Sequence, residues 1–81
     1  MNIGDYVTVQ EIANQTVHRW VVLVDLRTDD NGDIDGGTIK YIENTKVKAG
    51  NKSAKLSNKG ITSLLVCGSA EGLVVGGVFV K

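Results

Sequence analysis

The acidic segment at residues 28–37 contains the side chains best suited to binding a metal ion. Asn31, Asp33 and Asp35 occupy alternate positions, which is the order of the first ligands in a calcium-binding EF-hand loop. The pattern then departs from such a loop, because the first ligand is an amide and the twelfth position is Ile42. We therefore expect a solvated turn, with Asn31, Asp33 and Asp35 only as weak metal-ligand candidates.

A lysine-rich segment, residues 46–59, is the second candidate binding surface. If it is helical, four of its lysines fall on one face: Lys48, Lys52, Lys55 and Lys59. Such a face can bind phosphates by releasing counterions. The segment has no arginine to recognise a base edge and no aromatic residue to stack on a base. A solvated helix face is therefore the main interpretation, and anion or nucleic-acid binding is the alternative.

Catalytic chemistry has little support in the sequence. The chain contains one histidine, His18, and one cysteine, Cys67. Cys67 ends an apolar run, where a small thiol usually packs in the core. His18 falls at an expected helix end, with no constellation of serine or carboxylate groups around it. We therefore predict no enzymatic activity, no catalytic residues and no cofactor.

The first element expected to position these residues is an amphipathic helix from Thr8 to about residue 20. Thr8 and Glu11 have the spacing of a capping box. Apolar or small side chains then recur at helical intervals, at Val9, Ile12, Ala13, Thr16, Val17 and Trp20. Residues 20–26 form a short run rich in β-branched side chains, which predicts a strand covered at least in part on both faces.

A hairpin is expected next. Asn31-Gly32 is a favoured dipeptide for a tight turn, because both positions tolerate a positive φ. Residues 38–42 alternate between apolar and polar side chains and predict the returning strand.

Residues 45–60 are open to two interpretations. In the first, Thr45 caps a helix that ends at Gly60, with Ile61 folding back onto it. In the second, the segment is a hairpin that turns at Gly50-Asn51. A glycine inside a helix costs about 1 kcal/mol relative to alanine, which favours the hairpin, but the helix remains our prediction.

The C-terminal part predicts two more strands, residues 61–67 and residues 73–80. Gly76-Gly77 lies inside the second of these, where a bulge or a close backbone approach explains it better than a phosphate cradle does. The expected fold is α+β with the order α-β-β-α-β-β, its helices packed on one face of a small, mainly antiparallel sheet. A small all-β barrel is the alternative.

Several of these segments together resemble a group of short, uncharacterised prokaryotic proteins. The resemblance is carried by residues 8–13, by Trp20-Val21-Val22-Leu23-Val24-Asp25, by the acidic Asn-Gly turn, by Gly37-Thr38-Ile39, and by Gly68 with Glu71-Gly72. It covers about residues 8–75. The resemblance implies an N-terminal helix followed by a hairpin. Because that group has no assigned activity, the resemblance indicates nothing about function.

Composition and length predict a single domain spanning residues 1–81. Hydrophobic residues make up 42% of the 81 residues and charged residues 22%, as in ordinary globular proteins. No apolar run approaches the roughly 20 residues needed to cross a bilayer, and we find no secretory signal at the N-terminus. The single cysteine fits a reducing compartment. We therefore expect a cytoplasmic protein that does not bind membranes.

The charges are distributed unevenly along the chain. Residues 1–43 contain three basic and eight acidic side chains, and residues 44–81 contain six basic and one acidic. Such asymmetry can mark a partner surface. The main interpretation is that the two halves neutralise each other in the fold.

The expected function is a small interaction or accessory module. A domain of this size without a disulfide has only a marginal core. Its last strand, residues 73–80, carries no charge, although edge strands of monomers are usually protected. We therefore predict a homo-oligomer, or a protein partner, bound through the last strand. Nucleic-acid or anion binding through residues 46–59 is the alternative.

Overall fold

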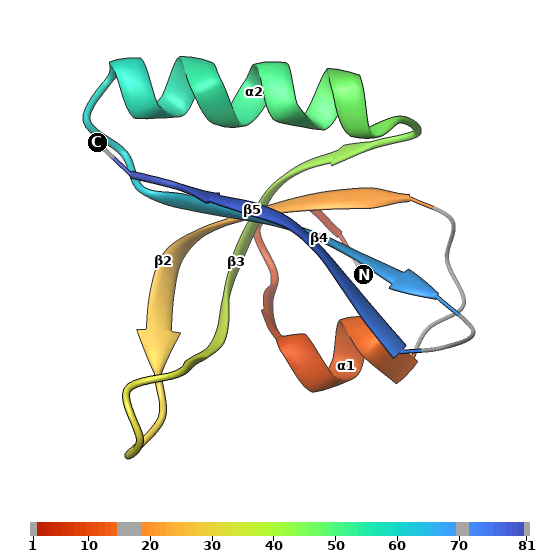
Figure 1. Ribbon diagram of the computed structural model, residues 1–81, viewed down its shortest axis with the longest axis vertical. Coiled ribbons are helices and arrows are strands. Elements are labelled where there is room, and N and C mark those ends of the chain that lie inside the picture. Colours follow the sequence, from red (N-terminus) through yellow and green to blue (C-terminus); the bar gives the residue numbers. More distant parts are fainter. Residues whose placement is uncertain (1, 15–18, 70–71, 81) are drawn as a thin grey trace.

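The computed structural model describes residues 2–14, 19–69 and 72–80. Over these residues the chain forms a strand-rich α+β fold in the order β-α-β-β-α-β-β (Figure 1). The α+β class agrees with the prediction. The predicted order α-β-β-α-β-β is wrong, because a short strand precedes the first helix.

The N-terminal elements are β1 (Tyr6–Thr8) and α1 (Val9–Asn14). The predicted capping box is confirmed: the Glu11 amide donates to Thr8 Oγ1 over 3.1 Å, and the Thr8 amide donates to Glu11 Oε1 over 3.4 Å. The described helix is shorter than expected. Residues 15–18 lie outside the described residues, and Trp20 belongs to the next strand.

A long hairpin follows, formed by β2 (Trp20–Thr28) and β3 (Ile34–Glu43). Both strands extend further than the predicted segments. The turn also differs in detail, because the Gly32 amide donates to the Asp29 carbonyl, so that Asp30 and Asn31 are the central residues. Gly32 follows them with a φ of 85°. A positive φ was expected at both Asn31 and Gly32, but only Gly32 has one.

Two glycines of β3 let the neighbouring strands approach closely, Gly36 on the β1 side and Gly37 on the β2 side. A Cβ atom on Gly36 would lie 2.3 Å from the Val7 carbonyl oxygen, and one on Gly37 would lie 2.7 Å from the Val24 carbonyl oxygen. Val7 pairs with Gly37 in this ladder, and its side chain is buried. The sequence interpretation assigned both glycines to the turn. They belong to a strand that its neighbours approach closely.

The lysine-rich segment forms α2 (Lys46–Asn58), so the helix is confirmed and the alternative hairpin is wrong. Thr45 caps its start, because Thr45 Oγ1 accepts from the Lys48 amide over 3.2 Å. At its end the amides of Gly60 and Ile61 donate to the carbonyls of Ser57 and Leu56, respectively. With Gly60 at a φ of 80°, this is the predicted Schellman motif.

The chain ends with β4 (Ser63–Ser69) and β5 (Gly72–Phe79). All the pairings are antiparallel, and the strand order across the sheet is β1-β3-β2-β4-β5. The sheet is open, so the alternative of a closed all-β barrel is wrong.

The two helices lie on opposite faces of the sheet, which corrects the expectation of a single covered face (Figure 1). On the α1 face, Ile12 packs in a cluster with Val21, Leu23, Leu64 and Val66 and their neighbours. On the α2 face, a second cluster contains Val22, Leu65, Ala49 and Leu56. The physical reason is that β2 and β4 carry apolar side chains on both faces, and each face must be covered. Within the described ranges, neither helix is long and apolar enough to span a membrane.

The close approach at Gly36 predicts a contrast between two glycine-to-alanine substitutions. Gly36→Ala places a methyl group against the backbone of β1, and we expect a loss of about 1–3 kcal/mol of unfolding free energy. Gly50→Ala on α2 meets no atom within 4 Å and should add about 0.5–1 kcal/mol, because alanine is the better helix former. Urea denaturation of both variants measures the difference. A Gly36→Ala protein as stable as the parent would contradict the described packing of β1.

Candidate functional site

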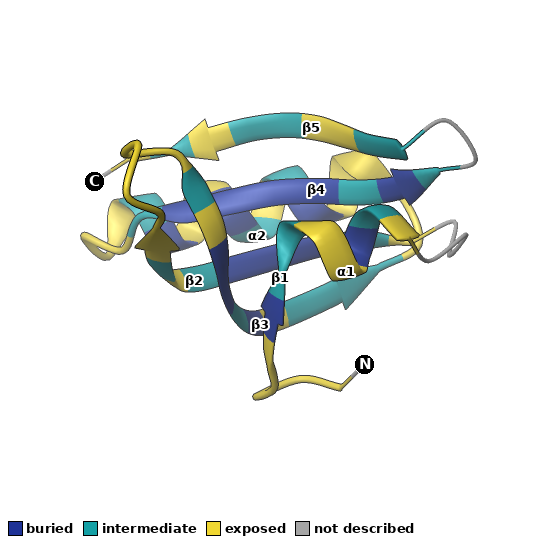
Figure 2. Cartoon of the chain, turned by 90° about the horizontal axis from the view of Figure 1, so that it is seen from below, coloured by how far each residue is buried: buried dark blue, intermediate teal, exposed yellow. Residues whose placement is uncertain are grey.

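The outer strand β5 is the main candidate site. It pairs with β4 on one side and with no described strand on the other. Its residues carry no charge, and three of its valines are substantially exposed: Val74 by 44%, Val75 by 56% and Val78 by 49%. In Figure 2, β5 runs along one side of the molecule and is exposed or half-buried, whereas β4 beside it is mostly buried.

The valines of β5 are divided between the two faces of the sheet. Val75 pairs with Val66, and Val78 pairs with Leu64. Because paired residues share a face and Val66 and Leu64 lie in the α1 cluster, Val75 and Val78 form an apolar stripe on the α1 side. Val74 pairs with Cys67 and lies on the α2 side. A partner at this edge would therefore contact valines on both faces.

A bulge interrupts β5 near its middle. Leu65 pairs with Gly77 and Val66 pairs with Val75, so Gly76 is the additional residue. A Cβ atom on Gly76 would lie 2.9 Å from both the Leu65 side chain and the Trp20 ring. The predicted bulge and the predicted close approach are both present here. They bring the backbone of β5 against the only tryptophan of the chain.

The opposite edge of the sheet is formed by β1, which is less suited to strand addition than β5. β1 is only three residues long, and the Arg27 guanidinium lies 5.2 Å from the ring centroid of Tyr6. Short strands and charged side chains are common means of preventing association at a sheet edge. Among the described strands, β5 is therefore the edge better suited to a partner.

The lysine row on α2 is the second candidate surface. Lys48, Lys55 and Lys59 are exposed. The Lys52 ammonium instead lies 4.9 Å from the ring centroid of Tyr41, so its side chain partly covers the sheet. The helix contains no acidic residue. Three of the four predicted lysines therefore present their charge to solvent.

Two aromatic residues lie near this row of lysines, and the sequence of the lysine-rich segment does not predict that they do. Trp20 and Tyr41 come from β2 and β3 and pack against the α2 cluster. Lys46 lies 5.8 Å from the centroid of the Trp20 ring, which parallels the contact between Lys52 and Tyr41. A basic and aromatic surface thus forms from three separate elements. The only sequence signal for the position of Tyr41 was the alternation of apolar and polar residues in β3. That alternation predicts that Tyr41 lies on the same face of the sheet as its partner in β2.

The acidic turn holds itself together through Asp29. Its Oδ1 atom accepts from the amides of Asn31 and Asp33 over 2.9 and 3.1 Å. The weak candidates Asn31, Asp33 and Asp35 are all exposed. Among the residues that the structure describes, no group of three or more His, Cys, Asp or Glu side chains is placed to hold a metal ion. The Asp29 contacts explain the turn as a structural feature.

The acidic turn and the basic helix lie far apart in the fold. The turn extends from the sheet on the side away from α2 (Figure 1). The expected neutralisation of one half of the chain by the other therefore does not arise from contact between these two segments. The molecule has one basic side and one acidic end.

Of the two candidates for nucleophilic chemistry, the structure describes only Cys67. Cys67 is half-buried at the end of β4, and its thiol donates to the Gly68 carbonyl over 3.3 Å. This is a more exposed position than the core packing we expected. His18 lies outside the described residues.

Sequence reasoning missed Asp25, which is the one described non-glycine residue with a positive φ, at 49°. It lies where the ladder between β2 and β3 is irregular, between the pairs Val24–Thr38 and Arg27–Gly36. The available signal was a charged residue that interrupts the apolar run of β2.

Comparison with known proteins gives no match to a family model, to a curated protein or to a solved structure. The resemblance to short prokaryotic proteins therefore stays a prediction.

Proposed function

We propose that this protein is a non-enzymatic interaction module of the cytoplasm that associates with another polypeptide through β5, and in the simplest case with a second copy of itself. The observation that supports this most directly is an uncharged outer strand with three exposed valines. Strands of this kind add to the edge of another sheet or accept a strand from a partner.

The Gly76 bulge limits how a partner strand binds. Because the bulge interrupts the regular ladder, an added strand would pair with residues 72–75 or with residues 77–79, and not with all of β5. Burial of the exposed halves of three valine side chains would contribute roughly 3 kcal/mol. Association costs at least about 4 kcal/mol, so hydrogen bonds must supply the rest. We therefore expect modest, concentration-dependent affinity.

A charge placed on β5 should prevent this association. We expect the parent protein to show a mass near twice 8.6 kDa at high micromolar concentration, and Val75→Lys to show the monomer mass, because an edge lysine opposes strand addition. Val47 is the matched control, because it is a valine of α2 that is 73% exposed. Val47→Lys should leave the mass unchanged. Size-exclusion chromatography with light scattering measures all three proteins.

Two results would contradict self-association through β5. One is a monomeric parent protein at every concentration tested. The other is a dimer that Val47→Lys and Val75→Lys disrupt equally, since the interface would then not lie at β5.

A second candidate function is binding of a polyanion, such as single-stranded nucleic acid, by the α2 surface. It is favoured by a specific observation: Lys48 and Lys55 on α2 and Lys59 directly after it are exposed, and α2 has no acidic residue and lies on the side away from the acidic turn. Lys52, which packs on Tyr41, would contribute less.

This candidate predicts binding that weakens steeply with salt. Each lysine that neutralises a phosphate of a single strand adds about 0.7 to the slope of log K against log salt concentration. Lys55→Gln should lower the slope by about that amount. Lys40→Gln, at an exposed lysine of β3, should leave it unchanged. Fluorescence anisotropy with a labelled oligonucleotide at several salt concentrations makes the measurement, and absence of binding at low salt would eliminate this function.

A further inference from the structure

The sheet opens where β2 and β4 part. β2 pairs with β4 only from Trp20 to Leu23, and the last pair joins Leu23 to Leu64. Beyond that point β2 continues as the partner of β3, and the hairpin bends away from the start of β4 (Figure 1). The two neighbouring strands therefore diverge and leave a depression between them.

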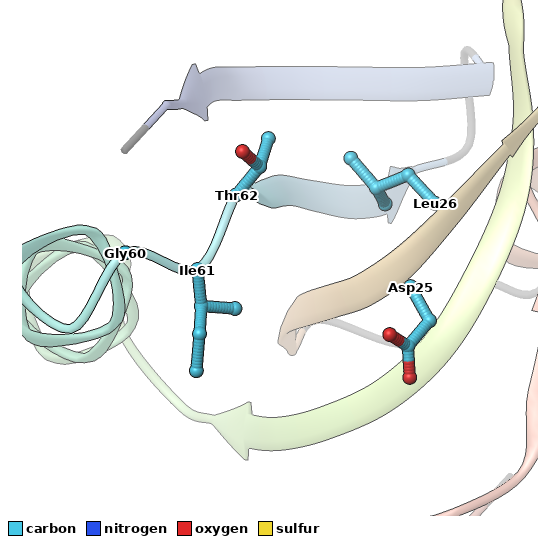
Figure 3. Close-up of a pocket in the computed structure, with 5 residues that line it drawn as sticks. All are labelled: Asp25, Leu26, Gly60, Ile61 and Thr62. Carbon is cyan, nitrogen blue, oxygen red and sulfur yellow. The ribbon is translucent and has the colours of Figure 1, made fainter.

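This depression is open, has a volume of about 430 Å³, and is lined by Asp25, Leu26, Gly60, Ile61 and Thr62. Asp25 and Leu26 come from β2, and the other three residues come from the segment that joins α2 to β4 (Figure 3). The side chains of Asp25 and Ile61 extend in the same direction from the two sides of the opening (Figure 3). The lining thus combines one carboxylate with two aliphatic side chains.

The backbone at Asp25 fixes where this carboxylate lies. The residue has a φ of 49°, within the left-handed region that non-glycine residues seldom occupy and that aspartate tolerates better than most. It belongs to the irregular part of the ladder opposite the glycines of β3. A strained residue that points a charged group into a depression is a feature expected of a ligand site.

Among the residues that the structure describes, the five that line the depression include no basic side chain. The nearest arginine in the sequence, Arg27, lies over the Tyr6 ring, at the opposite edge strand β1. Ile61 keeps 38% of its surface exposed. The depression therefore offers a ligand one negative charge, at Asp25, and one exposed aliphatic surface, at Ile61.

We propose that this depression binds an arginine side chain presented by a partner polypeptide. The guanidinium pairs with the Asp25 carboxylate in a forked geometry, which lysine cannot reproduce. The methylene stem of the arginine packs on Ile61, whose side chain extends in the same direction as Asp25 (Figure 3), since long basic side chains bury their stems on apolar surface. This inference goes beyond the function proposed for β5 and does not depend on it.

The test uses the whole chain and N-acetyl-arginine methylamide as the probe, followed by NMR chemical shifts of the backbone amides. We expect saturable shifts at residues 25–26 and 60–62, with a dissociation constant on the order of millimolar for one ion pair and one apolar contact. N-acetyl-citrulline methylamide, which has the same shape without the charge, should bind at least about tenfold more weakly.

Three variants locate the effect. Asp25→Asn removes the charge but keeps a residue that tolerates the left-handed conformation, and it should abolish the shifts. Asp25→Gly should do the same while folding at least as well, because glycine adopts this φ without strain. Asp35→Asn removes another exposed carboxylate, on β3 and outside the depression, and should bind as the parent does.

Three outcomes would overturn the proposal. The first is the absence of saturable shifts in the folded parent protein. The second is equal binding of the citrulline probe, since the carboxylate would then not be recognised. The third is binding that persists in both Asp25 variants or that maps to the acidic turn at residues 29–35, because the probe would then report only general attraction between charges.

Discussion

The pairing of β2 with β4 is the interaction on which the rest of the structure depends. Val22, Val66 and Leu65 are at most 1% exposed, and successive side chains along each strand point to opposite faces. Val66 therefore packs on the α1 side while Leu65 packs on the α2 side. Two strands thus supply the centre of both clusters, and neither face can be left open to water without exposing part of this pair.

This constraint explains the arrangement of the other elements. Each face requires its own helix, so α1 and α2 lie on opposite sides. The α2 interface is not perfectly complementary, because the hydroxyls of Ser53 and Ser63 are buried with no hydrogen-bond partner in the described structure. Buried hydroxyls of this kind cost stability. Three exposed valines lie on β5, which completes the sheet without being covered itself, and an interaction there would offset a modest core.

The parts of the fold that local side-chain chemistry determines were predictable from the sequence. The Thr8–Glu11 capping box and the Thr45, Gly60 and Ile61 signals at the ends of α2 involve residues a few positions apart, and their hydrogen bonds are as expected. β1 was not predictable in this way. It forms because Gly36, distant in sequence, lets the Val7 backbone approach, and no periodicity within residues 6–8 indicates such a contact.

The candidate sites also divide into features that local sequence predicts and features that depend on contacts distant in sequence. The lysine row follows from helical spacing, and the uncharged last strand is evident from composition, so both were predictable. The positions of Tyr41 and Trp20 beneath α2 depend on the sheet register, and the depression at Asp25 depends on where β2 and β4 part. The placement of the helices on two faces was indicated by the doubly apolar run at residues 20–24, but that signal does not state which helix covers which face.

Amide hydrogen exchange at several protein concentrations tests both the two-sided core and the open edge, because it reports separately on the doubly covered strands and on the outer strand. We expect the β4 amides to be strongly protected at every concentration, whereas β5 amides that do not donate to β4 should gain protection as the protein is concentrated. Unchanged exchange across β5 over the whole concentration range would contradict an edge that binds a second copy. Weak protection of β4 would contradict the two-sided core itself.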